Sequence, residues 1–282
     1  SILHCIMSCS KSITSACIDI AIQQGYIESV HQSIFDYLPE HQEFNTGNKS
    51  RITIEHLLTM SSELEWNEWN AAHGTSANDI DRLYLECSED PLRCVLERPM
   101  VAEPGEYFTY NGGGIMALGE ILRNATGMDI LEFSKINLLE PLGIDSIYWF
   151  VYPEGEYDTG GGIMMRPRDM LKLGVTYLNK GAWSGKQIIS PEWVEKSATV
   201  YNNNKRIKIP IEDSGRNGYG YAWWISKVGP DGDHMYRANG WGGQVIMVIP
   251  EKDMVVVFTS GNWAGKSSLF KILEKFILSA AN

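Results

Sequence analysis

Residues 8–24 read SCSKSITSACIDIAIQQ, and this stretch carries both a helix pattern and a candidate nucleophile. Its apolar residues recur at the i, i+3, i+4, i+7, i+8 spacing of one helix face, namely Ile13, Ala16, Cys17, Ile20 and Ala21. Gly25 follows at a position suited to end a helix. The stretch therefore predicts a helix from about Ser8 to Gln24 with one buried stripe.

Ser8 and Lys11 give the start of this helix an S-x-x-K spacing. Side chains at i and i+3 share a helix face, and a lysine that is desolvated enough to lose its proton can activate a serine hydroxyl. The helix N-terminus adds partial positive charge near a developing oxyanion. The alternative is an N-cap serine followed by a surface lysine. The pattern alone is not specific, because Ser268 and Lys271 repeat it in the last helical stretch.

Composition excludes several classes of protein. The chain has 282 residues, with 24 Lys+Arg against 35 Asp+Glu and a net charge of −11, which argues against a nucleic-acid binder. Hydrophobic residues make up 44% and charged residues 21%, so the chain is not a disordered one. No apolar run approaches the roughly 20 residues of a membrane-spanning helix, and none is predicted.

The cysteines predict neither a metal site nor a disulfide framework. The chain has five, without zinc-ligand spacing: Cys5, Cys9, Cys17, Cys87 and Cys94. Reduced and mostly buried thiols are expected, and a local Cys87–Cys94 bridge is the less favoured alternative. The unpaired thiols, with no visible signal peptide, give a weak preference for the cytoplasm. No metal and no organic cofactor is implied.

Further along, helical patterns give way to strand patterns. Helices are predicted over about 54–60, 113–124, 129–138 and 167–179, from Ser190-Pro191, and around Leu269 to Ile277. Three antiparallel strands are predicted at Tyr219 to Lys227, Tyr236 to Ile249 and Met254 to Thr259. This order favours an α+β layered fold. Residues 1–24 and 207–282 are expected to form the sheet-and-helix part, and 25–206 a mainly helical insertion, within one catalytic unit.

Two glycine-rich segments supply further candidate site residues. Tyr110 lies just before Gly112, Gly113 and Gly114, where its phenol can form a cleft wall. The alternative is a turn with a packed tyrosine. Residues 240–244 read GWGGQ, and glycines in a strand mark a bulge or the close approach of a ligand. A free N–H there would be a second oxyanion donor, and a bulged edge strand is the alternative.

Taken in order, these motifs resemble the serine β-lactamase-like hydrolases. That superfamily includes class C β-lactamases, DD-peptidases, related esterases and 6-aminohexanoate-dimer hydrolases. The resemblance covers almost the whole chain and rests on residues 8–12 (SCSKS), 52–60 (ITIEHLLTM), 104–106 (PGE) with Tyr110, 160–162 (GGG) with 168–170 (RDM), 185–190 (GKQIIS), 219–221 (YGY), 242–244 (GGQ) and 249–251 (IPE).

The resemblance implies a β-lactamase/transpeptidase-like fold and assigns roles by position. Ser8 would attack an acyl carbon, Lys11 would activate it, and Tyr110 would pass the proton to the leaving group. The backbone N–H groups of Ser8 and Trp241 would form the oxyanion hole. The substrate-binding residues would be Asn111, Gly112, Asn239, Gly240 and Gly242.

Three departures from the family pattern refine the expectation. Gly112 stands where the family often has an asparagine that holds a substrate amide. Ala238 stands where a lysine or histidine usually pairs with a substrate carboxylate. Only seven residues precede Ser8, where family members carry a helix and two strands. We therefore expect the sheet of this chain alone to be incomplete, with fewer than five strands.

These observations favour a serine hydrolase with an acyl-enzyme intermediate, acting as a carboxylesterase or on small linear amides. One alternative is a β-lactamase or DD-peptidase. Another is a non-catalytic binding or sensor protein, because a fold does not fix a function. The expected partner is a small-molecule ester or amide. The sequence does not fix the oligomeric state, a dimer included.

Overall fold

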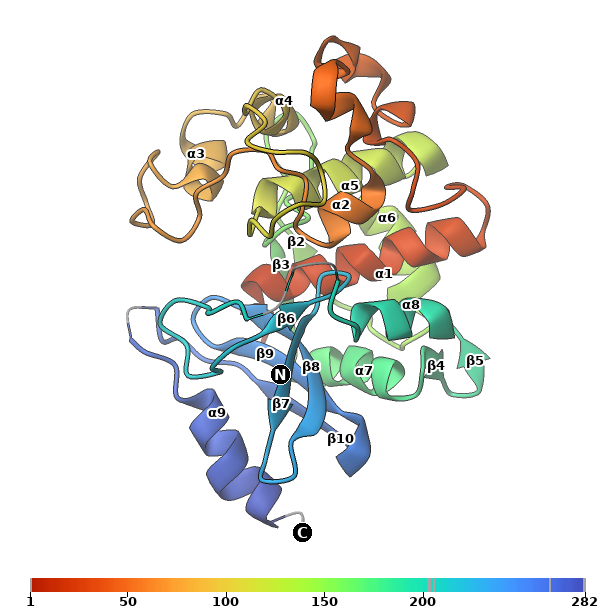
Figure 1. Cartoon of the computed structure of the whole chain (residues 1–282). Helices are drawn as coiled ribbons and strands as arrows, with labels where there is room; N and C mark the ends of the chain where they lie inside the picture. Colours follow the sequence, from red (N-terminus) through yellow and green to blue (C-terminus); the bar gives the residue numbers. More distant parts are fainter. Residues whose placement is uncertain (1, 202–203, 205, 264, 281–282) are drawn as a thin grey trace.

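The segment around Ser8 forms the central helix of the molecule in a computed structural model that describes residues 2–201, 204, 206–263 and 265–280. Helix α1 spans Ser10–Gln23, and a short 3-10 turn, η1 (Met7–Cys9), precedes it. Figure 1 shows α1 between the helical part and the sheet part. The predicted helix is confirmed, with α1 itself beginning at Ser10.

Helix α1 is buried on both sides, although its apolar spacing predicted one buried stripe. Every residue from Ser10 to Ala21 is buried. Its polar side uses short hydroxyl side chains: Ser12 donates to the carbonyl of Ala222 over 2.7 Å, and Ser15 to that of Tyr221 over 3.0 Å. A buried hydroxyl with a hydrogen-bond partner costs little, so the helix can lie between two layers.

The other predicted helices form as well, and local signals fix several ends. They are α2 Ile54–Leu58, α5 Gly112–Thr126, α6 Ile130–Ser134 with a π-helical continuation to Leu139, α7 Pro167–Leu178, α8 Pro191–Ser197, and α9 Leu269–Ile272 with continuations to Ala280. Asn111 caps α5, and Gly127 ends it with a φ of 74°. Two helices that the sequence did not predict are α3 (Asp79–Leu85) and α4 (Pro91–Leu96).

The main sheet has five antiparallel strands in the order β10–β9–β8–β7–β6. They are β6 Gly218–Tyr219, β7 Trp224–Val228, β8 Asp233–Gly240, β9 Gln244–Ile249 and β10 Met254–Phe258. The prediction of three strands is wrong, and so is the expectation of fewer than five.

Left-handed backbone positions explain this error. The run predicted as one strand over 236–249 is the hairpin β8–β9, in which Gly242 and Gly243 have φ values of 81° and 90°. Ala222, with a φ of 60°, likewise lies in the turn that separates β6 from β7. Because glycine adopts positive φ at little cost, a tight turn can sit inside an apolar run.

Strand β9 is covered on both faces. Ile246 and Val248 lie in the main core, whereas Met247 and Ile249 lie in a second core with residues of α9. Helix α7 packs on the main-core side against β9 and β10, and Figure 1 shows α9 on the other side of the sheet. Side chains alternate along a strand, so an uninterrupted apolar run is typical of a strand covered on both faces.

A small sheet holds the chain just before Ser8. It has the order β1–β3–β2, formed by β1 His4–Cys5, β3 Ile163–Met165 and β2 Tyr148–Trp149, and was not predicted. A hairpin of β4 (Ala182–Trp183) and β5 (Lys186–Gln187) was also not predicted. The backbone of Ile6 extends the pairing by donating to the carbonyl of Ile163 over 2.9 Å. The segment that leads into Ser8 therefore lies beside the turn at Gly160.

Two cysteines are joined, which corrects the expectation of five reduced thiols. A disulfide links Cys87 to Cys94, while Cys5, Cys9 and Cys17 are free. The preference for the cytoplasm rested on unpaired cysteines and loses that support. Among the described residues, no helix combines the length and hydropathy needed to cross a bilayer.

Candidate active site

Ser8 and Lys11 face each other at the start of α1. The Nζ of Lys11 lies 2.9 Å from the Oγ of Ser8 and 2.6 Å from the carbonyl oxygen of Gly160. Lys11 is only 2% exposed. The i, i+3 spacing thus forms a direct contact, and the interpretation of Lys11 as a surface lysine is wrong.

Tyr110 completes a three-residue cluster with this pair. It is the second residue before α5, and its ring centroid lies 5.2 Å from the Nζ of Lys11. The Ser8 hydroxyl is also close enough to lower the pKa of the Tyr110 phenol. Two segments that are about a hundred residues apart in the sequence therefore meet in this cluster.

The surroundings keep protons on both Lys11 and Tyr110. Burial is the largest influence on Lys11 and lowers its pKa, but nearby Tyr110, Glu68 and Asp158 together raise the pKa above its ordinary value. Burial raises the pKa of the Tyr110 phenol, and the Lys11 ammonium opposes that rise only in part. The two groups therefore titrate as a coupled pair, in which the charged form of each favours the charged form of the other.

Glu68 is a site residue that the sequence did not reveal. Its Oε2 accepts from the indole Nε1 of Trp66 over 2.7 Å and from the backbone N–H of Gly112. These bonds tie the loop around residue 68 to the first residue of α5, next to Tyr110. Glu68 matches no motif spacing, and the only signal was its place in the aromatic stretch 65–70 (EWNEWN).

Asp158 is a second acid that the sequence did not reveal. Its Oδ1 accepts from the backbone N–H groups of Gly160 and Gly161 over 3.0 and 2.9 Å, and its Oδ2 accepts from the hydroxyl of Tyr84. This shapes the turn whose Gly160 carbonyl accepts from Lys11. Asp158 thus positions Lys11 through the backbone and also adds negative charge near it.

The end of β8 packs tightly against the segment before Ser8. A Cβ atom on Gly240 would lie 2.3 Å from the carbonyl oxygen of Ile6, so only glycine fits there. This contact places Trp241 beside the cleft that Ser8 lines. The Trp241 indole stacks on the imidazole of His73 with centroids 4.3 Å apart. The turn after β8 and the loop before α3 therefore meet at the edge of the cleft.

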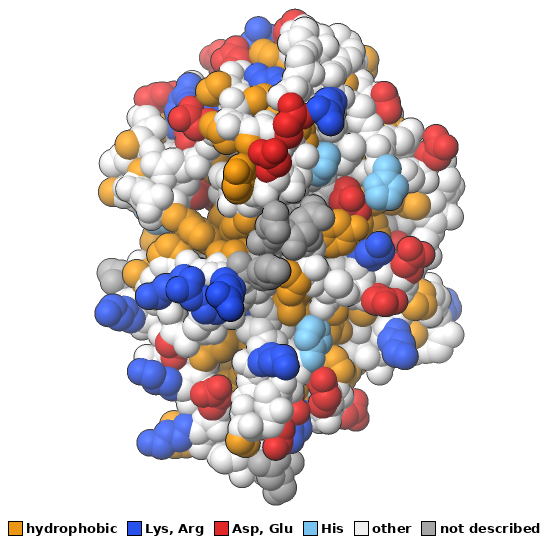
Figure 2. Space-filling model, viewed as in Figure 1, with side chains coloured by type: hydrophobic (Ala, Val, Ile, Leu, Met, Phe, Trp, Pro, Cys, Tyr) orange, Lys and Arg blue, Asp and Glu red, His pale blue; other side chains and the backbone are white. Residues whose placement is uncertain are grey.

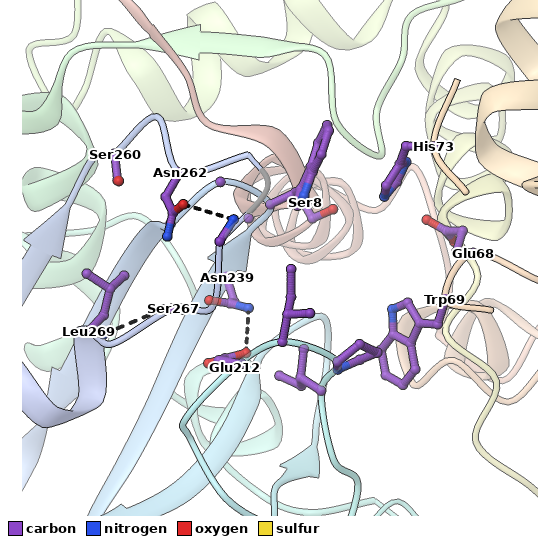
Figure 3. A pocket seen from close by; sticks show the side chains of 18 of the residues that line it. Ser8, Glu68, Trp69, His73, Glu212, Asn239, Ser260, Asn262, Ser267 and Leu269 are labelled. Carbon is purple, nitrogen blue, oxygen red and sulfur yellow. Dashed lines mark hydrogen bonds between the residues drawn. The ribbon is translucent and has the colours of Figure 1, made fainter. Parts of the chain in front are cut away.

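Ser8 opens into a cleft of about 300 Å³ between the helical part and the sheet part. Figure 2 shows apolar side chains gathered around this hollow. Trp69, Tyr110 and Trp224 form one wall, with ring centroids 5.2–6.1 Å apart and interplanar angles of 19–25°. In Figure 3, Glu68, Trp69 and His73 lie on one side of Ser8, and Asn239 and Glu212 on the other.

The five residues expected to bind substrate divide into two groups. Asn239, Gly240 and Gly242 line the cleft. Asn111 and Gly112 do not belong to the lining. Asn111 is 2% exposed and caps α5, and the backbone N–H of Gly112 donates to the carboxylate of Glu68. Both therefore serve the helix end that follows Tyr110.

Comparison with known proteins shows the family of this chain. The Beta-lactamase family model matches residues 3–277. Because that is nearly the whole chain, the protein belongs to the Beta-lactamase family.

Similar solved structures share the fold at low sequence identity. A Bacillus anthracis protein described as a 6-aminohexanoate-dimer hydrolase superposes with a TM-score of 0.82 at 22% identity, covering 100% of this chain and 73% of that one. A family VIII carboxylesterase gives a TM-score of 0.70 at 15% identity, with coverages of 92% and 77%. A D-stereospecific amidohydrolase from Streptomyces sp. gives 0.72 at 16% identity, with coverages of 98% and 86%.

Among curated proteins, the chain matches ML-236A carboxylate methylbutanoyltransferase from Penicillium citrinum. The match is 32% identical over 94 residues, which is 33% of this chain. It spans only 22% of that protein's length.

Proposed function

We propose that this protein is a serine hydrolase that forms an acyl-enzyme, acting on carboxylic esters first and small linear amides second. The observation that carries the proposal is the buried Nζ of Lys11, 2.9 Å from the Ser8 hydroxyl at an apolar cleft, with the Tyr110 ring 5.2 Å from the same Nζ. A buried cation is costly, so a purely structural role for Lys11 is a poor explanation.

The proposed reaction begins when Lys11 has lost its proton. The Oγ of Ser8 bonds to the acyl carbon, and its proton passes to Lys11. The oxyanion accepts hydrogen bonds from the backbone N–H groups of Ser8 and Trp241; losing one such donor typically costs about 10²–10³ in rate. As the oxyanion collapses, the bond between the acyl carbon and the leaving oxygen or nitrogen breaks, and Tyr110 donates its proton to that leaving group and regains one from Lys11. Water then attacks the acyl carbon, its proton returns to the Ser8 oxygen through the same pair, and the acid is released.

The cleft supports esters over β-lactams and peptides. None of the described residues that line it is Lys or Arg. Ala238 is buried in the main core, so its position offers nothing to a substrate carboxylate. The aromatic wall of Trp69, Tyr110 and Trp224 instead suits an apolar acyl or alkyl group.

Intact-mass measurement after exposure to a fluorophosphonate tests this function directly. One adduct is expected on the native chain and none on Ser8→Ala, and p-nitrophenyl esters should be hydrolysed only by the native chain. Ser12→Ala is a matched control, because Ser12 is a buried hydroxyl of the same helix that donates to Ala222 instead. Ester hydrolysis that survives in Ser8→Ala would refute the assignment. A folded native chain without adduct or turnover would favour the non-catalytic binding protein.

A second candidate is acyl transfer to an alcohol instead of to water. It is motivated by the match over 94 residues to a methylbutanoyltransferase. Adding a small alcohol to the ester assay distinguishes the two. A transferase would form the new ester at the expense of free acid, whereas a hydrolase would release the acid at an unchanged rate.

A further inference from the structure

The side of the cleft formed by β8 contains a buried charged cluster. Arg237 and Asn239 are two residues apart on β8, so their side chains lie on the same face. Both reach Glu212: the Nη2 of Arg237 lies 3.1 Å from its Oε1, and the Nδ2 of Asn239 lies 3.1 Å from its Oε2. Figure 3 shows the Asn239–Glu212 contact at the cleft wall.

Glu212 stands between the cleft and Arg237. Glu212 lines the cleft, and its side chain is 6% exposed, whereas Arg237 is 0% exposed and does not line it. Arg237 is also held by Ser226 and Asn217, over 3.1 and 3.0 Å. The guanidinium is therefore fixed in place, and the carboxylate with which it pairs, Glu212, belongs to the protein itself.

Glu212 also sets the orientation of Asn239. An ionised carboxylate only accepts hydrogen bonds, so the amide must turn its NH₂ group toward Glu212. Its Oδ1 accepts from no residue that the structure describes. On this side the cleft therefore offers a hydrogen-bond acceptor to a substrate, and Glu68 adds a carboxylate on the opposite side.

We propose that Glu212 is a specificity-determining residue. Its carboxylate occupies the place beside Arg237 where a substrate carboxylate could otherwise bind, so the cleft favours substrates with a neutral or cationic substituent over substrates with a carboxylate. This rests on the proposed ester hydrolysis and names its substrate class. An incoming carboxylate would meet Glu212, Glu68 and the Asn239 oxygen, and the buried Arg237 guanidinium is already paired with Glu212. A substituent with an N–H, O–H or ammonium group would find acceptors.

Three matched esters test the proposal: p-nitrophenyl valerate, mono-p-nitrophenyl glutarate and p-nitrophenyl 4-(trimethylammonio)butanoate. The native chain is expected to hydrolyse the glutarate ester with a kcat/KM at least about tenfold below that of the valerate ester, and the cationic ester no worse than the valerate. In Glu212→Ala the glutarate-to-valerate ratio should rise about 10- to 100-fold, the usual worth of a charge-assisted hydrogen bond. Glu251→Ala, a change at an exposed position away from the cleft, is the control and should keep the native ratio.

A double variant, Glu212→Met with Arg237→Met, tests why the ratio rises. It distinguishes pairing of the substrate carboxylate with Arg237 from a mere loss of repulsion by Glu212. The proposal requires the ratio in this variant to stay near the native value, because the guanidinium is gone. A rise as large as in Glu212→Ala would overturn it, as would native hydrolysis of the glutarate ester at the valerate rate. Replacing a buried ion pair by apolar residues is often tolerated. The double variant therefore keeps the proposal testable even if Glu212→Ala, which leaves Arg237 unpaired, fails to fold.

A binding measurement that needs no turnover distinguishes the role of Glu212 from the proposed ester hydrolysis. Free glutarate should raise the melting temperature of Glu212→Ala and leave that of the native chain unchanged. That result would support the role of Glu212 even if no ester were hydrolysed, and turnover of valerate alone would support only the proposed hydrolysis. Equal shifts in both chains, or none in Glu212→Ala, would overturn the role of Glu212.

Discussion

Replacing Glu68 with Gln tests how the site sets its own pH dependence. The Glu68 carboxylate raises the pKa of both Lys11 and Tyr110. Glutamine has nearly the same shape, and its carbonyl oxygen can keep the hydrogen bonds from Trp66 and Gly112. The substitution therefore removes a charge and preserves the local structure.

The expected size of the effect follows from Coulomb's law. Two unit charges about 10 Å apart still interact by roughly 1.7 kcal/mol at an effective dielectric of about 20, and about 1.4 kcal/mol is a tenfold change in an equilibrium constant. Because Glu68 is one of the charges that raise the pKa of Lys11, Glu68→Gln should lower that pKa by an amount that a pH–rate profile resolves. Neutral Lys11 is the proposed base, so the acid limb of the kcat/KM profile should move down by the same amount. The basic limb should move in the same direction, because the pKa of Tyr110 also falls.

The assay is kcat/KM for a p-nitrophenyl ester between about pH 6 and 11.5, corrected for spontaneous hydrolysis. Glu65→Gln is the matched control, because Glu65 is a neighbouring carboxylate whose side chain is 56% exposed and lies 3.6 Å from Arg98. Its profile should coincide with the native one. A lower rate with both limbs unmoved would show that Glu68 acts only as a structural anchor, and an upward shift would contradict the electrostatic reasoning.

Two further predictions concern stability. Gly174→Ala should lower the free energy of unfolding by about 1–3 kcal/mol in urea titration, because its Cβ would lie 2.5 Å from Val255. Gly114→Ala is the control, because its Cβ would meet only ordinary contacts, and equal losses in both variants would show that crowding is not the cause. Replacing Cys87 and Cys94 together by serine should lower the free energy of unfolding by about 2 kcal/mol through loop entropy, while ester turnover survives. Unchanged stability of this variant in non-reducing buffer would contradict a formed disulfide.

Much of the site was predictable because its signals are local. The Ser8–Lys11 spacing fixes a shared helix face wherever a helix forms, and the contact between the two side chains follows from it. The cap at Asn111 and the stop at Gly127 are equally local. Patterns of this kind depend on neighbours within a few residues, so they survive in any tertiary context.

The number of strands in the main sheet was predicted wrongly because two turns lie within apolar runs of the sequence. Nothing in the composition of 236–249 separates β8 from β9 except the glycines at 242 and 243, which the sequence favoured as a bulge or a ligand contact. The two-residue strands β1 and β2 lie far apart in the chain and exist only because each pairs with β3. Pairing at that separation leaves no periodic signal.

The sequence by itself determined the helix that follows Ser8, the family resemblance and the three residues that cluster at the candidate nucleophile. Only the tertiary structure decided the electrostatics of the site. Glu68 and Asp158 act on Lys11 because the fold brings these distant segments together and burial strengthens their charge interactions. The fold likewise brings Glu212 to Arg237 and Asn239. The pKa of Lys11 and the charge that the cleft accepts are therefore properties of the packed molecule, set by the low dielectric of its interior.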